Sequence, residues 1–276
     1  MLINLISKSE KFITGLVLMK KHKYSALYRY IQELHGDHPW GSMLDAGTGA
    51  NSIRWMSELP TQRWTAVTGS RPHAQLSIEA AGTAMRLQDK IVVGNWADKQ
   101  FMPGEMYDTV IADYLLGAIE GFSPYFQSYL FPRLHSLTRH KLYVTGLEPY
   151  VPISKPDTHA GQLLWEIGRF RDACVLLKGG MPYREYPLPW VIDQLNLAGF
   201  KVCSTKQFNI RYKDLFVNAQ INMAITGLDS LEDNVLVKAL NHRAESLRST
   251  AQKLIKQQGA LGLCRNYVVA AEPIRN

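Results

Sequence analysis

Short apolar runs alternate with segments of helical spacing through the first half of the chain. Because these runs are short and bounded by turn residues, they predict five strands, at 42–46, 64–69, 91–93, 108–113 and 141–147. The intervening segments predict helices at about 51–59, 72–87 and 124–137, the second with Pro72 near its start. Strands that alternate with helices predict a parallel sheet covered on both faces.

The ends of the chain have a different pattern. Helical spacing over about 7–34 stops at a turn-forming segment, 36–39, and predicts a helical cap that occupies residues 1–40. Beyond the fifth strand, a helix at about 190–198 ends at Gly199 and precedes a strand that starts at 200–204 and extends toward Ile210. A final strand is expected at 267–271.

Two long segments interrupt the alternation of strands and helices. We expect a cofactor-binding core at 41–149, a lid insertion at 150–186, and the end of the core at 187–276, itself interrupted by a helical insertion at about 211–262. Ligands of open α/β sheets bind at the carboxyl ends of the strands. Two insertions at one edge of the sheet therefore predict a lid over that cleft.

Composition narrows the class of protein. The 276 residues are 46% hydrophobic, enough for a sizeable core, and the apolar run 12–19 is shorter than the roughly 20 residues of a membrane helix. We expect a soluble cytoplasmic protein without a cleaved signal peptide. The three cysteines are far apart and predict neither disulfides nor a metal site. The net charge of +7 leaves room for an anionic substrate or for RNA, although the basic residues form no long tract.

The loop after the first predicted strand is the clearest chemical signal. It reads Asp45-Ala46-Gly47-Thr48-Gly49, an acid at a strand tip followed by two glycines that open a helix. Glycine can take positive φ and leaves the backbone bare, so a ligand can lie against main-chain amides. The loop therefore predicts a site for a nucleotide-like cofactor such as an adenosine derivative.

Two further segments extend this signal. Gly94-Asn95-Trp96-Ala97-Asp98 follows the third strand, and Tyr107 to Tyr114 forms the fourth strand and its tip. Together with the glycine loop they resemble the class I methyltransferases that use S-adenosylmethionine, over about 42–147 and loosely over the closing strands. The resemblance implies a mostly parallel, seven-stranded Rossmann-like sheet with an antiparallel last strand and helical lid insertions. It implies that cofactor is bound by Asp45, Ala46, Gly47, Thr48, Gly49, Ser70, Asn95, Trp96 and Asp113. Ser70 stands where such enzymes usually have an acid that holds the ribose.

Methyl transfer is an in-line displacement that depends on alignment more than on a base. The polar groups that this architecture directs at the methyl acceptor are Asp113 and Tyr114 at the fourth strand tip and Glu148 after the fifth strand. Arginines suit bidentate capture of an anion. We expect substrate contacts from Tyr28, Tyr150, Arg169, Tyr183 and Arg184.

The leading hypothesis is a methyltransferase for a small, anionic metabolite, with a sulfur-containing hydroxy acid that yields a sulfonium product as one candidate. An RNA methyltransferase and a non-catalytic S-adenosylmethionine-binding protein remain alternatives. An NAD-dependent dehydrogenase is disfavoured because Ser70 replaces the ribose-binding acid and Asp45 precedes the glycines. We expect no metal and no membrane partner, and a homodimer is left open.

Overall fold

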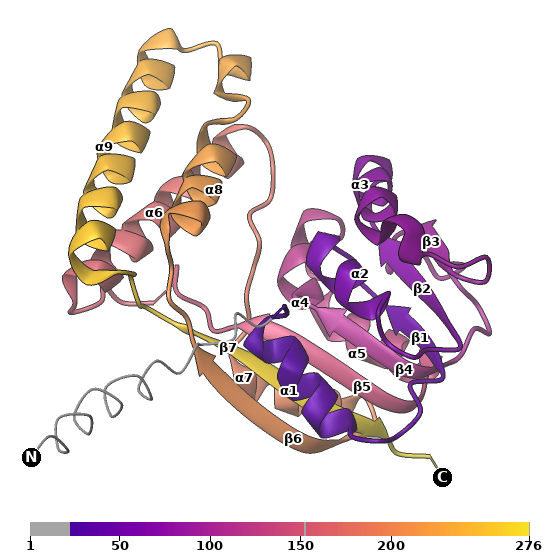
Figure 1. The fold of residues 1–276 in the computed structure, drawn as a ribbon. Coiled ribbons are helices and arrows are strands. Elements are labelled where there is room, and N and C mark those ends of the chain that lie inside the picture. The colour runs from indigo at the N-terminus through magenta and orange to yellow at the C-terminus, as the bar shows by residue number, and fades with distance from the viewer. Residues whose placement is uncertain (1–22, 152, 276) are drawn as a thin grey trace, which may run out of the picture.

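The computed structural model describes residues 23–151 and 153–275. In these residues a seven-stranded sheet has the order β3-β2-β1-β4-β5-β7-β6 (Figure 1). All neighbouring pairs are parallel except those of β7, which runs antiparallel to β5 and β6. The predicted sheet with its antiparallel last strand is confirmed. The strands are β1 Ser42–Asp45, β2 Arg63–Thr68, β3 Lys90–Val93, β4 Tyr107–Asp113, β5 Thr138–Leu147, β6 Phe200–Asn209 and β7 Arg265–Pro273.

Helices cover both faces of the sheet, and neighbouring strand residues alternate between two cores. Met43 and Ile111 belong to the core beneath α1 Ala26–His35, α2 Ala50–Met56 and α3 Arg71–Ala81. Leu44 and Val110 belong to the core on the other face, beneath α4 Leu115–Ala118, α5 Gln127–Leu137 and α7 Leu188–Leu197. Strands buried on both sides explain why their sequences are nearly continuous apolar runs.

Several predicted boundaries differ from the structure. The helix predicted at 72–87 ends at Ala81, because Gly82 takes a φ of 53° before the short 3-10 helix η1 Gly82–Ala84. The helix predicted at 124–137 begins at Gln127, and the preceding α4 and η2 Ile119–Gly121 were not predicted. The helix predicted at 51–59 spans Ala50–Met56. Of the predicted cap helices, residues 1–22 lie outside the described part of the chain, and the rest form α1.

The two insertions pack on each other. The first contributes α6 His159–Leu177, and the second contributes α8 Asp214–Ile225, η3 Leu228–Ser230 and α9 Asn234–Gln258. Their buried side chains form a separate core that includes Leu163, Ile221 and Leu254. Figure 1 shows α6, α8 and α9 grouped to one side, away from α2 and α3. Both insertions leave the sheet at the carboxyl end of a strand, α6 after β5 and α8 after β6.

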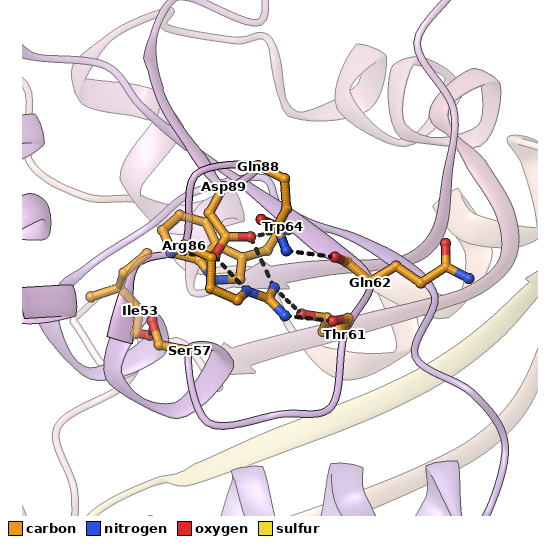
Figure 2. A network of polar contacts seen from close by, with 8 residues as sticks. All are labelled: Ile53, Ser57, Thr61, Gln62, Trp64, Arg86, Gln88 and Asp89. Carbon is orange, nitrogen blue, oxygen red and sulfur yellow. Dashed lines mark hydrogen bonds and ion pairs between the residues drawn. The ribbon is translucent and has the colours of Figure 1, made fainter. Parts of the chain in front are cut away.

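An ion pair between a buried Asp89 and a partly exposed Arg86 fastens the segment before β3 to β2 (Figure 2). Asp89, only 4% exposed, accepts hydrogen bonds from Arg86 Nε at 2.8 Å and from the Trp64 N–H at 2.9 Å. Arg86 also donates to the Thr61 carbonyl at 2.7 Å. Burial alone would raise the pKa of Asp89, but the bonds from Arg86 and Trp64 outweigh it and lower that pKa. The network thus ties the segment before β3 to the start of β2.

None of the helices within 23–151 and 153–275 combines the length and apolar character that a membrane crossing requires.

Candidate active site

Two adjoining cavities lie at the carboxyl ends of the strands. The smaller, of about 150 Å³, follows the loops after β1, β2 and β3 and is lined by residues that include Gly47, Gly69 and Trp96. The larger, of about 1030 Å³, extends from the tip of β4 to the inserted helices. Ala118 and Tyr183 line both cavities. A ligand held by the β1 loop could therefore reach the larger cavity.

Asp45 ends β1 as a fully buried carboxyl group. Its Oδ1 accepts a long hydrogen bond of 3.4 Å from the Gly47 N–H, and its Oδ2 has no hydrogen-bond partner within the described residues. Burial raises its pKa to about 7, against a lowering hydrogen bond with Ser52, and nearby Asp113 adds to the rise. A buried carboxyl oxygen without a partner is costly and is typical of ligand sites.

The two loop glycines have different structural roles, and neither has the positive φ that glycine would allow. A Cβ on Gly47 would lie 2.8 Å from Leu115 Cδ1, so glycine is needed there because α4 packs against the loop. Gly49 has an extended φ of −136°, and a Cβ there would meet nothing within 4 Å. Gly49 therefore leaves bare backbone beside open space, whereas Gly47 serves packing.

Asn95 and Trp96, two of the predicted cofactor-binding residues, form hydrogen bonds with other residues of the chain. Asn95 Oδ1 accepts from Ser123 Oγ at 2.7 Å and from the Ala97 N–H at 3.0 Å, so both of its acceptor positions are in use. Trp96, 4% exposed, donates from Nε1 to the Ala46 carbonyl at 2.7 Å. This bond joins the β3 loop to the β1 loop.

Ser70 caps α3, since its Oγ accepts from the His73 N–H at 3.3 Å. Ser70 does not line the smaller cavity, whereas its neighbours Gly69 and His73 do. The ribose contact of Ser70 stays a prediction: at the β2 tip it is Gly69 that lines the cavity, and the Ser70 hydroxyl caps the helix.

Asp113 is held at the tip of β4 by two hydroxyl groups. Its Oδ2 accepts from the Tyr28 hydroxyl at 2.6 Å and its Oδ1 from Thr145 Oγ1 at 2.5 Å. Tyr28 is itself fixed by stacking on Trp55, with ring centroids 4.7 Å apart. Burial raises the pKa of Asp113 against both hydrogen bonds. The structure thus brings Tyr28 and Asp113 together, and adds Thr145, which the sequence did not single out.

Tyr114 follows in a left-handed conformation, with a φ of 50°. This backbone region is sparsely populated by non-glycine residues and marks a constrained position. The Tyr114 N–H is held by the Thr145 carbonyl at 3.2 Å. The sharp turn ends β4, begins α4, and places Tyr114 on the wall of the larger cavity.

The predicted substrate residues divide into two groups. Tyr150, Tyr183 and Arg184 line the larger cavity. Arg169 does not: it is exposed and lies over the Trp165 ring, with its guanidinium carbon 4.7 Å from the ring centroid. Arg171, two residues further along α6, lines the cavity in its place.

Glu148, predicted as a catalytic group, also lies outside the cavity lining. Its Oε1 accepts from the Leu188 N–H at 3.2 Å and from Gln207 Nε2 at 2.8 Å, so the side chain joins α7 to β6. A structural role accounts for both contacts.

Four charged residues of the larger cavity were not among the predicted site residues: Arg171, Asp172, Glu185 and Arg211. Arg171 donates from Nε to Asp172 at 2.7 Å and from Nη1 to the Tyr150 hydroxyl at 3.2 Å, so its charge is largely compensated. Glu185 lies over α4, where a Cβ on Gly117 would be 2.6 Å from its Oε1. Burial raises the pKa of Glu185 to about 7, with Arg171 opposing. Its neighbours Tyr183 and Arg184 were predicted as substrate contacts, but Glu185 itself was not given a role.

Within the described ranges, no three His, Cys, Asp or Glu side chains are close enough together to hold a metal ion.

Comparisons with known proteins add evidence on the fold. No protein-family model and no curated protein matches the sequence. Among solved structures, a Bacillus halodurans chain provisionally assigned as a methyltransferase is 10% identical, with a TM-score of 0.58 over 91% of this chain and 99% of that one. A cyclopropane synthase of Mycobacterium tuberculosis is 16% identical, with a TM-score of 0.52 over 92% and 87%.

A third solved structure is phosphoethanolamine N-methyltransferase 2 of Haemonchus contortus, in complex with phosphomonomethylethanolamine and S-adenosylhomocysteine. It is 16% identical, with a TM-score of 0.52 over 90% of this chain and 52% of that one. These likenesses agree with the observed strand order and the antiparallel β7. The chain therefore has the Rossmann-like fold of these methyltransferases.

Proposed function

We propose that the chain is an S-adenosylmethionine-dependent methyltransferase that acts on a small molecule. The observation that carries the proposal is the loop 45–49, where Ala46, Gly47 and Thr48 line the smaller cavity and a buried carboxyl oxygen of the adjacent Asp45 lacks a partner within the described residues. A site of this kind fits a ligand with hydrogen-bond donors. The fold is that of proteins such as the Haemonchus contortus enzyme, whose structure contains S-adenosylhomocysteine.

The cavities also fit this cofactor. Ligand pockets usually measure about 300–1,000 Å³, so the smaller cavity of about 150 Å³ would hold only part of an adenosyl group. The remainder would extend past Ala118 and Tyr183 into the larger cavity, toward Asp113 and Tyr114. Asp45, Ala46, Gly47 and Thr48 would hold the cofactor along the loop, and the bond from Trp96 Nε1 to the Ala46 carbonyl would keep the loop in place.

When bound, S-adenosylmethionine supplies a methyl group on a positively charged sulfur. The residues of this chain would align the acceptor, which is the main requirement of an in-line displacement. Asp113, fixed by Tyr28 and Thr145, offers a rigid carboxyl group on the wall of the larger cavity. We infer that the insertions at 150–186 and about 211–262 serve as a lid that excludes water.

The predicted anionic acceptor receives less support than the methyl transfer itself. Arg169 lies outside the cavity, and Arg171 is paired with Asp172. Arg184 remains on the wall, but its side chain is 52% exposed and lies 3.6 Å from Glu120. We therefore retain the small-molecule acceptor, for which the enclosing cavity argues, and do not extend the proposal to a sulfur-containing hydroxy acid.

Calorimetric titration tests the proposal. S-adenosylhomocysteine should bind to the full chain, and NAD should not. Gly49→Leu, which fills open space beside the loop, should weaken that binding by about tenfold or more. Gly262→Leu is a matched control, because this exposed glycine between α9 and β7 has only one neighbour, at 3.8 Å. Tight NAD binding without S-adenosylhomocysteine binding would refute the proposal.

A further inference from the structure

The larger cavity contains six charged side chains, but their charges are not equally available. Asp113 accepts two hydrogen bonds, and Arg171 pairs with Asp172. The other three are Arg184, Arg211 and Glu185. Arg184 and Arg211 are exposed to solvent, whereas Glu185 is half-buried and makes no hydrogen bond to another described residue. Glu185 is therefore the charged group in the cavity that has neither a hydrogen bond nor an ion pair with a described residue, nor full exposure to water, to stabilise its charge.

The backbone around Glu185 is anchored on both sides. The Arg184 N–H donates to the Gly117 carbonyl at 3.3 Å, and the Tyr186 carbonyl accepts from the Tyr267 hydroxyl at 2.9 Å. The carboxylate itself packs over Gly117, where any Cβ would displace it. This segment between α6 and α7 thus holds a carboxylate in a defined place at the cavity wall.

The rest of the wall is apolar and rich in tyrosine. Five tyrosines line the cavity, along with aliphatic and phenylalanine side chains from α6, α8 and the adjoining loops. The faces of aromatic rings attract cations, and the attraction grows when water is excluded. A half-buried carboxylate on a wall that carries such rings suits an ammonium group with an apolar body.

We propose that the larger cavity binds a bulky, largely apolar molecule that carries an ammonium group, and that the Glu185 carboxylate holds this group. For the role of this molecule as methyl acceptor, the inference rests on the proposed function. The volume of about 1030 Å³ is at the upper end for ligand pockets, so the cavity has room for a bulky molecule beside the part of the cofactor that would extend into it.

Three probes that share an eight-carbon chain and differ in their polar group test the inference: octylamine, octanol and octanoate. Calorimetric titrations use the full chain, with and without saturating S-adenosylhomocysteine. The wild type should bind octylamine at least about tenfold more tightly than the other two, because a charge-assisted bond is lost with either replacement. Equal binding of octanol, or tighter binding of octanoate, would overturn the inference.

Two variants locate the effect. Glu185→Gln should abolish the preference for octylamine, and Gly117→Ala should reduce it without a change in charge, since its Cβ would come 2.6 Å from Glu185 Oε1. Glu105→Gln, at an exposed position outside the cavity, is the matched control and should retain the preference. A preference that survives in both cavity variants would contradict the assignment of Glu185.

The cofactor titration separates this inference from the proposed function. If S-adenosylhomocysteine binds while the three probes bind equally, the inference fails and the proposed function stands. If S-adenosylhomocysteine does not bind while the octylamine preference depends on Glu185, the proposed function fails and the ammonium site stands.

Discussion

Replacement of Asp45 by asparagine should stabilise the chain and weaken its cofactor binding at the same time. The buried carboxyl group has its pKa raised from 3.8 to about 7. Between these values the folded chain holds a proton that the unfolded chain has lost, so stability falls as the pH rises through this window. Asparagine has no charge to bury and removes this penalty.

The size of the effect follows from the pKa difference. A difference of about three pH units corresponds to about 4 kcal/mol of unfolding free energy, at about 1.36 kcal/mol for each. Asp45→Asn should therefore equal the wild type near pH 4 and exceed it by up to about 4 kcal/mol near pH 8. Urea unfolding at a series of pH values measures the difference. Calorimetry should show weaker S-adenosylhomocysteine binding by about tenfold or more, as in other stability–function trade-offs.

Asp108→Asn is the matched control, because the Asp108 carboxylate has hydrogen-bond partners, whereas Asp45 Oδ2 has none within the described residues. Its Oδ2 accepts from the Ser42 N–H at 2.8 Å and from Ser42 Oγ at 2.7 Å. Burial alone would raise its pKa, but these bonds and Arg139 lower it. The control should lose about 1–3 kcal/mol of stability above pH 4. A constant difference between Asp45→Asn and the wild type from pH 4 to pH 8 would refute the reasoning.

Two further changes test the packing around the site. Gly47→Ala should lower the unfolding midpoint by about 2–10 °C in differential scanning calorimetry, because its Cβ would lie 2.8 Å from Leu115; an unchanged midpoint would mean that α4 can yield freely. Asp89→Asn should lower the free energy of unfolding by about 1–3 kcal/mol, measured by urea unfolding at pH 7, because it weakens the bonds to Arg86 and Trp64. Since the pKa of Asp89 is lowered, this loss should shrink as the pH falls below about 4 and the wild-type carboxylate is protonated; a loss independent of pH would contradict it.

The sheet was predictable because its strands carry their own signal. Apolar runs such as 110–112 in β4 exist because both faces of the sheet are buried, and the turn residues between the strands are local. By contrast, α4 and η2 were not predictable, since a four-residue helix leaves no periodic pattern. The end of α3 depended on the conformation of Gly82, which the periodicity did not reveal.

In the site too, features encoded by adjacent residues were predictable, and features that depend on contacts between distant residues were not. The loop 45–49 and the β4 tip were predictable, because strand, acid and glycines are neighbours in the sequence. The choice of arginine on α6 was not: two residues apart on a helix point to different sides, and only the packed structure shows that Arg171 faces the cavity. Glu185 reaches the site through an irregular segment anchored by Gly117 and Tyr267, contacts between residues distant in sequence.

A crystal structure of the full chain grown with S-adenosylhomocysteine tests the central claim most directly. The account predicts electron density for the ligand along residues 45–49, with the Asp45 carboxyl group in hydrogen-bond contact and the sulfur facing Asp113 and the larger cavity. Density for the ligand at another place on the chain, or an empty loop at saturating concentration, would contradict the account.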